Sequence, residues 1–111
     1  MNKKELSQLK KLYQTKFQDH CKKFLENHNS QAYLRKQTLL VDSLIINIWQ
    51  NLYIDKNIVL VAVGGYGRKE LFPFSDVDIL IVFEKIITVN DQEAISQFIT
   101  NCWDLGLKIG H

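Results

Sequence analysis

The stretch VAVGGYGRKELFPFSDVDILIVF, residues 61–83, determines the fold that we expect for this chain. It joins two apolar runs through a short polar segment that contains three glycines. The first run, residues 58–63, is rich in β-branched side chains and ends at Gly64 and Gly65, so it predicts a buried strand that enters a tight turn. The second run, residues 77–83, predicts another buried strand. The stretch therefore indicates two strands of one sheet with a polar site between them.

Two aspartates open the second strand, one residue apart. Because side chains alternate between the faces of a strand, Asp76 and Asp78 should project together, while Val77 points to the other layer. Two like charges at that spacing repel each other unless a cation lies between them. Carboxylate oxygens on a rigid strand suit a hard ion, Mg²⁺ or Mn²⁺, which completes its shell with water and phosphate oxygens. The pair therefore predicts a divalent metal site.

The glycines and the basic residue that follows them fit a phosphate group. Gly64 and Gly65 have no Cβ, so their backbone can approach a phosphate closely and offer N–H groups to it. Arg68 can supply positive charge for a triphosphate, and Ser75 either braces the turn or contacts a phosphate. A phosphate cradle followed after about ten residues by a metal clamp predicts a site for a metal-bound nucleoside triphosphate, although the spacing is not that of a Walker loop.

The composition is ordinary for a soluble globular protein. The chain has 111 residues, enough for one domain, of which 46% are hydrophobic and 23% charged. A net charge of +2 does not predict the strongly basic face of a nucleic-acid binder. The longest apolar run is too short to cross a bilayer, and no signal peptide is visible. We expect a cytoplasmic protein with two reduced, buried thiols, Cys21 and Cys102, that binds neither nucleic acid nor membrane.

Helical periodicity marks three further segments. Apolar residues at steps of three and four predict helices over residues 5–27 and 31–52, which should form a hairpin. Thr88 can cap a third helix that ends near residue 104. One helical turn is expected over residues 68–72, ahead of a proline. The third helix should direct five side chains inward: Ile95, Phe98, Ile99, Cys102 and Trp103.

These elements divide the chain into two parts. Residues 1–54 form an N-terminal helical segment, and residues 55–111 form a core that holds the strands. A third strand starts near Leu107, and the two strands with this fragment leave an unpaired sheet edge. We therefore expect a core that continues in a larger parent protein. The predicted fold class is α/β (α+β), with a partial small sheet and an N-terminal helical hairpin.

The central motif resembles that of a known superfamily. The order strand, Gly-Gly, short spacer and Asp-x-Asp on a second strand is similar to the signature of nucleotidyltransferases with the polymerase-β-like fold. VAVGGYGRKELFPFSDVDILIV resembles in particular the nucleotidyltransferase domain of the bacterial PII uridylyltransferases, the bifunctional uridylyltransferase/uridylyl-removing enzymes of nitrogen regulation. LRKQTLLVDSLIINIWQNL and CWDLGLKIGH resemble the segments on either side, so the likeness covers residues 34–111.

The resemblance implies Mg²⁺-dependent transfer of UMP from UTP to a tyrosine of the PII signalling protein, with release of pyrophosphate. Asp76 and Asp78 would be the catalytic carboxylates and hold Mg²⁺, with two ions in the full site. Gly64 and Gly65 would bind phosphate. The hydrolase domain and the two ACT domains of such enzymes do not fit in 111 residues. The isolated chain should therefore lack uridylyl removal and glutamine control.

One part of the superfamily pattern has no match in this chain, and two other functions stay open. The pattern includes a third carboxylate on a later strand. The nearby acids are Glu70, Glu84 and Asp104, and we expect the last two to face solvent. An adenylyltransferase would share the glycines and the aspartate pair. A non-catalytic module that binds a nucleotide or a partner would lack the third acid.

Overall fold

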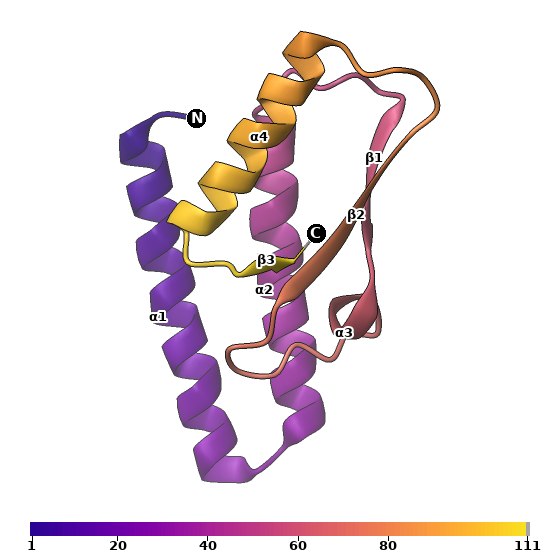
Figure 1. Cartoon of the computed structure of the whole chain (residues 1–111). Coiled ribbons are helices and arrows are strands. Elements are labelled where there is room, and N and C mark those ends of the chain that lie inside the picture. The colour runs from indigo at the N-terminus through magenta and orange to yellow at the C-terminus, as the bar shows by residue number, and fades with distance from the viewer. Residues whose placement is uncertain (111) are drawn as a thin grey trace.

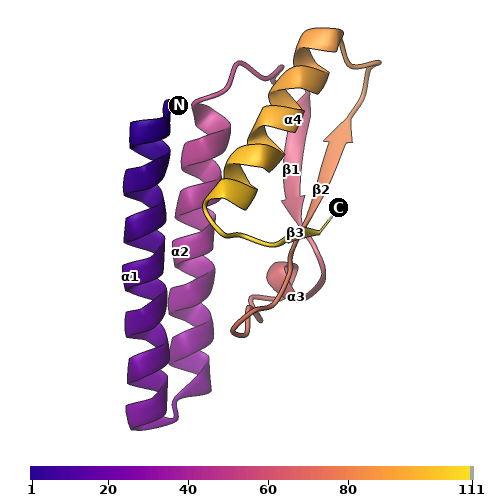
Figure 2. The ribbon, with the colours of Figure 1, turned by 60° about the vertical axis from the view of Figure 1, so that its left-hand side comes forward.

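The computed structural model describes residues 1–110 and begins with a helical hairpin (Figure 1). Helix α1 is Lys3–Asn27 and helix α2 is Ser30–Gln50, so both expected helices are confirmed with small differences at their ends. The link is short because His28 takes a left-handed conformation, with φ of 54°, and ends α1. Asn29 then caps α2 by accepting a hydrogen bond from the Ala32 amide at 3.1 Å. The two helices consequently run side by side in opposite directions (Figure 2).

The second half of the chain forms a small mixed sheet and two helices. Strand β1 is Ile58–Ala62, β2 is Val77–Phe83 and β3 is Ile109–Gly110, and they lie in the order β1-β2-β3. β1 pairs with β2 in antiparallel fashion, and β3 pairs with β2 in parallel. Helix α3 is Gly64–Gly67, and helix α4, Val89–Asp104, leads from β2 to β3. Thr88 caps α4 through a capping box, as expected.

The helical turn between β1 and β2 lies earlier than residues 68–72, so that prediction is wrong. α3 begins directly after β1, because Gly64 turns the chain with φ of +59° and the Gly67 amide then donates to the Val63 carbonyl at 2.9 Å. Helical geometry stops soon afterwards, since Lys69 has φ of 60°. The residues after α3 form an irregular loop that returns the chain to the start of β2.

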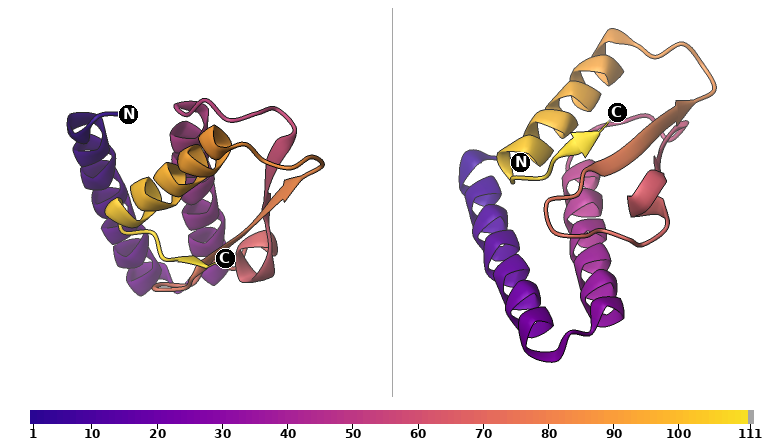
Figure 3. Two further views of the ribbon diagram at one scale, coloured as in Figure 1. Left: turned by 45° about the horizontal axis from the view of Figure 1, so that its top comes forward. Right: turned by 60° about the horizontal axis from the view of Figure 1, so that its bottom comes forward.

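Helices α2 and α4 pack on the same face of the sheet and form one core with it (Figures 2 and 3). At the centre of this core, Phe98 of α4 and Ile48 of α2 have no exposed surface. The Trp49 ring stands edge-on to the Phe98 ring, with centroids 5.1 Å apart. The strands are thereby held on one side by two helices, which fixes where their loops emerge.

Two expectations about burial are wrong. The strands are not buried on both faces, because the three large helices all lie on one side of the sheet (Figure 3). The opposite face of β1 and β2 carries aliphatic side chains that are 41% to 52% exposed. These side chains are Val59, Val61, Leu80 and Val82. Trp103 is 54% exposed as well, since the inward stripe of α4 is centred on Phe98 and Cys102.

The two thiols should differ sharply in reactivity. Cys102 has no exposed surface, and burial raises the pKa of its thiol from 9.0 to about 12. Cys21 is only half-buried, so the expectation of two buried thiols is wrong for Cys21. At pH 8 we expect one fast-reacting thiol per folded chain with a disulfide reagent, because about one Cys102 in 10⁴ is then ionised. Cys21→Ser should remove that fast reaction. Two equally fast thiols in the folded chain would contradict this assignment.

The same pKa shift gives a pH dependence of stability. The raised pKa of Cys102 adds to the free energy of unfolding, and this addition is fully present below about pH 9. It is lost as the pH rises toward 12, because the unfolded chain releases the Cys102 proton at a lower pH than the folded chain does. The urea midpoint of unfolding should therefore fall between pH 9 and pH 11.

Candidate metal and nucleotide site

Asp76 and Asp78 lie on the same side of the chain at the start of β2. Val77 between them is 3% exposed and belongs to the core, and its amide donates to the Lys108 carbonyl at 2.7 Å. A Cβ built on Gly110 of β3 would overlap Oδ1 of Asp78 and lie 3.9 Å from Cβ of Asp76. Both aspartates thus face the space in front of β3, where Asp78 is half-buried and Asp76 is exposed.

The glycine turn meets the second aspartate directly. A Cβ on Gly64 would lie only 2.7 Å from Oδ2 of Asp78, so the turn can approach the carboxylate only because residue 64 has no side chain. The Val63 amide donates to the Asp78 carbonyl at 3.1 Å and keeps the two segments in register. A phosphate held by the turn would therefore lie beside an ion held by the aspartates. Gly110 closes the other side of Asp78, although it was not among the predicted site residues.

The remaining glycines of the turn differ in what a side chain would meet. A Cβ on Gly67 would lie 2.7 Å from the Ala62 carbonyl oxygen, which is backbone and cannot move away easily. A Cβ on Gly65 would meet nothing nearer than the Glu70 carbonyl oxygen, at 3.5 Å. Gly67 is therefore required by packing, whereas Gly65 has room in front of it.

Arg68 lies beside the turn, with Nη2 4.0 Å from the position that a Gly65 Cβ would take. Its Nε is 3.3 Å from Oε2 of Glu70, and the two side chains are 65% and 47% exposed. Exposed ion pairs contribute little to stability, so this pair would cost little to break. The guanidinium is thus available to a phosphate at the turn.

Ser75 is not gathered with the aspartates. It lines a cavity of about 250 Å³ between α1, α2 and the turn that enters β3, together with Phe17 and Phe74. Its amide donates to the Phe72 carbonyl at 3.0 Å and closes the loop before Asp76. Of the two roles predicted for Ser75, bracing the turn or contacting a phosphate, this placement fits the bracing role.

Two further residues support the turn, and neither was among the predicted site residues. The Tyr66 hydroxyl donates to Oδ1 of Asp42 at 2.5 Å. Tyr66 lies between two glycines of the turn, and Asp42 lies on α2. Burial raises the pKa of Tyr66, and the Asp42 carboxylate raises it further. An aspartate beside the apolar stripe of a helix was the signal that could have pointed to Asp42.

The two aspartates fit a hard divalent ion as a pair of oxygen ligands. Among residues 1–110, no set of three or more His, Cys, Asp and Glu side chains comes together as a metal centre. Glu70, Glu84 and Asp104 are all exposed, as expected for the last two. Mg²⁺ commonly takes one or two protein carboxylates and fills its other positions with water and substrate phosphates. The pair is therefore sufficient for an ion that arrives with a nucleotide.

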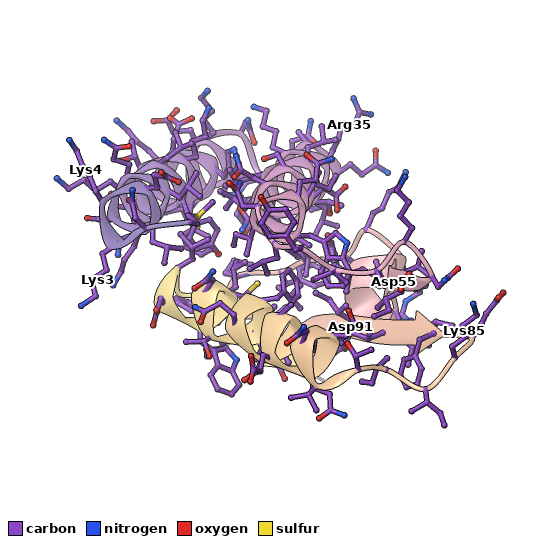
Figure 4. All side chains as sticks on the ribbon, turned by 90° about the horizontal axis from the view of Figure 1, so that it is seen from above. Lys3, Lys4, Arg35, Asp55, Lys85 and Asp91 are labelled. Carbon is purple, nitrogen blue, oxygen red and sulfur yellow. The ribbon has the colours of Figure 1, made fainter. Side chains whose placement is uncertain are left out.

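Other charged groups lie away from the pair. Asp55, Lys85 and Asp91 line a small hollow at the opposite end of the sheet (Figure 4). Lys3 and Lys4 extend from the start of α1, at another edge of the molecule (Figure 4). No helix in the described residues is long and apolar enough to cross a membrane.

Residues 42–106 match the model of the nucleotidyltransferase domain family, and the chain belongs to that family. The matched segment starts at Asp42 and includes β1, the glycine turn, the aspartates and α4. Membership and the three-stranded sheet agree with the expected polymerase-β-like α/β fold. The class of enzyme that the motif predicted is thereby confirmed.

Curated relatives are similar over most of the chain. It is 40% identical over 88 residues to the bifunctional uridylyltransferase/uridylyl-removing enzyme of Thiobacillus denitrificans. The aligned segment covers 79% of this chain and 10% of that enzyme. It is 39% identical over 109 residues to the enzyme of the same name from Vibrio atlanticus. That aligned segment covers 96% of this chain and 12% of the relative. The chain thus spans about a tenth of the length of these relatives. No solved structure matches it.

Proposed function

We propose that this chain is the nucleotide-binding and metal-binding part of a uridylyltransferase that transfers UMP from UTP to a tyrosine of a PII-type signalling protein. The observation that carries the proposal is the contact between the glycine turn and the Asp78 carboxylate. It brings a phosphate cradle and a metal ligand together. The similarity to bifunctional uridylyltransferases over most of the chain supports uracil as the base and the PII protein as the acceptor.

Each predicted site residue has a role in this proposal. Asp76 and Asp78 would hold Mg²⁺, and the ion when bound would offset charge on the phosphate oxygens. Gly64 and Gly65 would bind phosphate through backbone N–H groups, because the first amides of a helical turn have no carbonyl partner before them. Arg68 would leave Glu70 and bind the triphosphate.

In the reaction, the acceptor hydroxyl oxygen would form a bond to the α-phosphorus of UTP. The bond from that phosphorus to the bridging oxygen would break, and pyrophosphate would leave with the bond electrons. The hydroxyl proton must pass to a base. In residues 1–110 no third acid joins the aspartate pair, so we assign this chain the binding of the nucleotide and leave the base unassigned.

The proposal is tested by calorimetry on the purified chain. We expect Mg²⁺–UTP to bind at least about tenfold more tightly than Mg²⁺–ATP, a difference of about 1.4 kcal/mol. Binding should disappear when EDTA removes the metal, because the aspartate pair alone repels a triphosphate. UTP without Mg²⁺ is the matched control.

The other outcomes lead to different conclusions. Tighter binding of Mg²⁺–ATP would replace uridylyl transfer with adenylyl transfer. If the folded chain bound neither nucleotide, it would not contain a working nucleotide site, and the proposal would fail for these residues.

A further inference from the structure

The glycine turn has little stability of its own. α3 is a single helical turn of four residues, and three of them are glycine. Such a short segment is not stable alone, and glycine is an unfavourable helix residue. Val63 precedes α3 without a side-chain capping hydrogen bond. Lys69, two residues after the end of α3, has φ of 60°, a conformation that non-glycine residues seldom adopt. Contacts from elsewhere in the molecule must therefore hold the turn.

Tyr66 is the side chain that attaches the turn to the core. It is 6% exposed and belongs to the same buried cluster as Val41 and Ile48 of α2. Its hydroxyl donates to Oδ1 of Asp42, one helix position after Val41. α2 is firmly fixed at this point, because Val41 is 1% exposed and Ile48 is fully buried. The turn is thus attached to a rigid helix through one ring and one hydrogen bond.

The hydrogen bond is of a strong kind. A hydroxyl that donates to a carboxylate forms a charge-assisted bond, roughly twice as strong as one between neutral groups. The ion pairs of the described residues do not include Asp42, so no cation competes for its carboxylate there. Burial and Asp42 both raise the pKa of Tyr66, which keeps its proton at neutral pH.

The bond also lies next to the proposed nucleotide site. Tyr66 lies two residues after Gly64, where an added Cβ would lie only 2.7 Å from Oδ2 of Asp78. A shift of the turn would either open a gap at Asp78 or push its carboxylate toward Gly110. The distance between phosphate cradle and metal ligands therefore depends on Tyr66.

We propose that Asp42 and Tyr66 are a positioning pair, which holds the glycine turn against Asp78 so that the triphosphate and its ion bind together. Neither residue touches the nucleotide in this proposal. The pair acts through Gly64 and Asp78, and its effect on nucleotide affinity rests on the proposed function above.

The test uses substitutions that keep side-chain shape. Tyr66→Phe removes only the hydroxyl, and Asp42→Ala removes the acceptor. Asp42→Asn keeps an acceptor oxygen at the same place and should keep the bond in a weaker, neutral form. Tyr33→Phe is the matched control, because Tyr33 is a buried tyrosine of α2 whose hydroxyl has no hydrogen-bond partner in the described residues.

Two measurements are made on each variant. Amide hydrogen exchange follows Arg68 and Glu70, whose N–H groups donate to the Gly64 and Gly65 carbonyls at 3.1 and 2.8 Å. We expect exchange there to be about tenfold faster in Tyr66→Phe and Asp42→Ala, while α2 and α4 stay protected. The dissociation constant for Mg²⁺–UTP should rise about tenfold in both variants. Asp42→Asn should be affected less than Asp42→Ala, because a neutral acceptor remains, and Tyr33→Phe should resemble the wild type in both measurements.

The result that overturns the proposal is equal exchange and equal affinity in Tyr66→Phe and Tyr33→Phe. Faster exchange throughout the chain in Tyr66→Phe would also overturn it, since the bond would then serve general stability. If the wild type bound no nucleotide, the proposed function would fail, and exchange at Arg68 and Glu70 alone would decide whether the pair holds the turn. If Asp42→Ala did not fold, Tyr66→Phe and Asp42→Asn would carry the test.

Discussion

Asp78→Asn is expected to weaken Mg²⁺–UTP binding by more than about 100-fold, beyond the loss typical for residues that only support metal ligands. The amide cannot replace the carboxylate as an anionic ligand, and Asp78 is the aspartate that contacts both Gly64 and Gly110. The free energy of unfolding should change by less than about 0.5 kcal/mol, because the substitution keeps the shape and relieves repulsion from Asp76. Calorimetry and urea unfolding measure the two quantities.

Asp104→Asn is the matched control for Asp78→Asn. It removes the same charge from an exposed position at the end of α4, outside the proposed site. Nucleotide binding should be unchanged in that variant. Normal Mg²⁺–UTP binding by Asp78→Asn would show that the metal assignment is wrong.

Gly64→Ala should weaken nucleotide binding strongly, for a different reason. An alanine at φ of +59° costs about 1–2 kcal/mol of stability, and its methyl group would lie 2.7 Å from Oδ2 of Asp78. Either the carboxylate or the turn must then move, so cradle and metal ligands separate. We expect affinity for Mg²⁺–UTP to fall by at least about 100-fold. The fall has two causes: the phosphate cradle separates from the metal ligands, and the turn can no longer approach the phosphate closely.

Gly106→Ala separates backbone strain from steric contact. Gly106 also has a positive φ, +94°, but a Cβ there would meet no atom within 4 Å. This variant should lose stability in urea unfolding and still bind the nucleotide as tightly as the wild type. If both glycine variants lost affinity equally, the approach of Gly64 to Asp78 would have no special importance.

Local signals in the sequence were enough to predict most elements. The three long helices follow from apolar spacing and from caps such as Thr88, which forms its capping box with Asp91. β2 follows from one apolar run between polar ends, and its bounds are those expected. The alternation rule also anticipated that Val77 is buried while the flanking aspartates face away from the core. The roles of the site residues in binding remain predictions.

Features that depend on packing were harder to predict. An apolar strand looks the same in sequence whether one face or both are covered, so the open face with Val59 and Leu80 was not foreseen. The contact of Tyr66 in α3 with Asp42 joins residues that are 24 positions apart in the chain, so local spacing does not reveal it. Gly110 could have been noticed, because a glycine in a strand often marks a close approach of another group.

The position of Asp78 between Gly64 and Gly110 has a consequence for folding. Three segments that are distant in sequence must meet before this carboxylate has its final surroundings, so the site forms by non-local contacts, which are slow to assemble. A partly folded chain does not contain the site, and a bound nucleotide stabilises the fully assembled state alone. Nucleotide affinity would then measure how complete the tertiary structure is, and mild damage in the core of α2 would reduce binding at temperatures where the helices still persist.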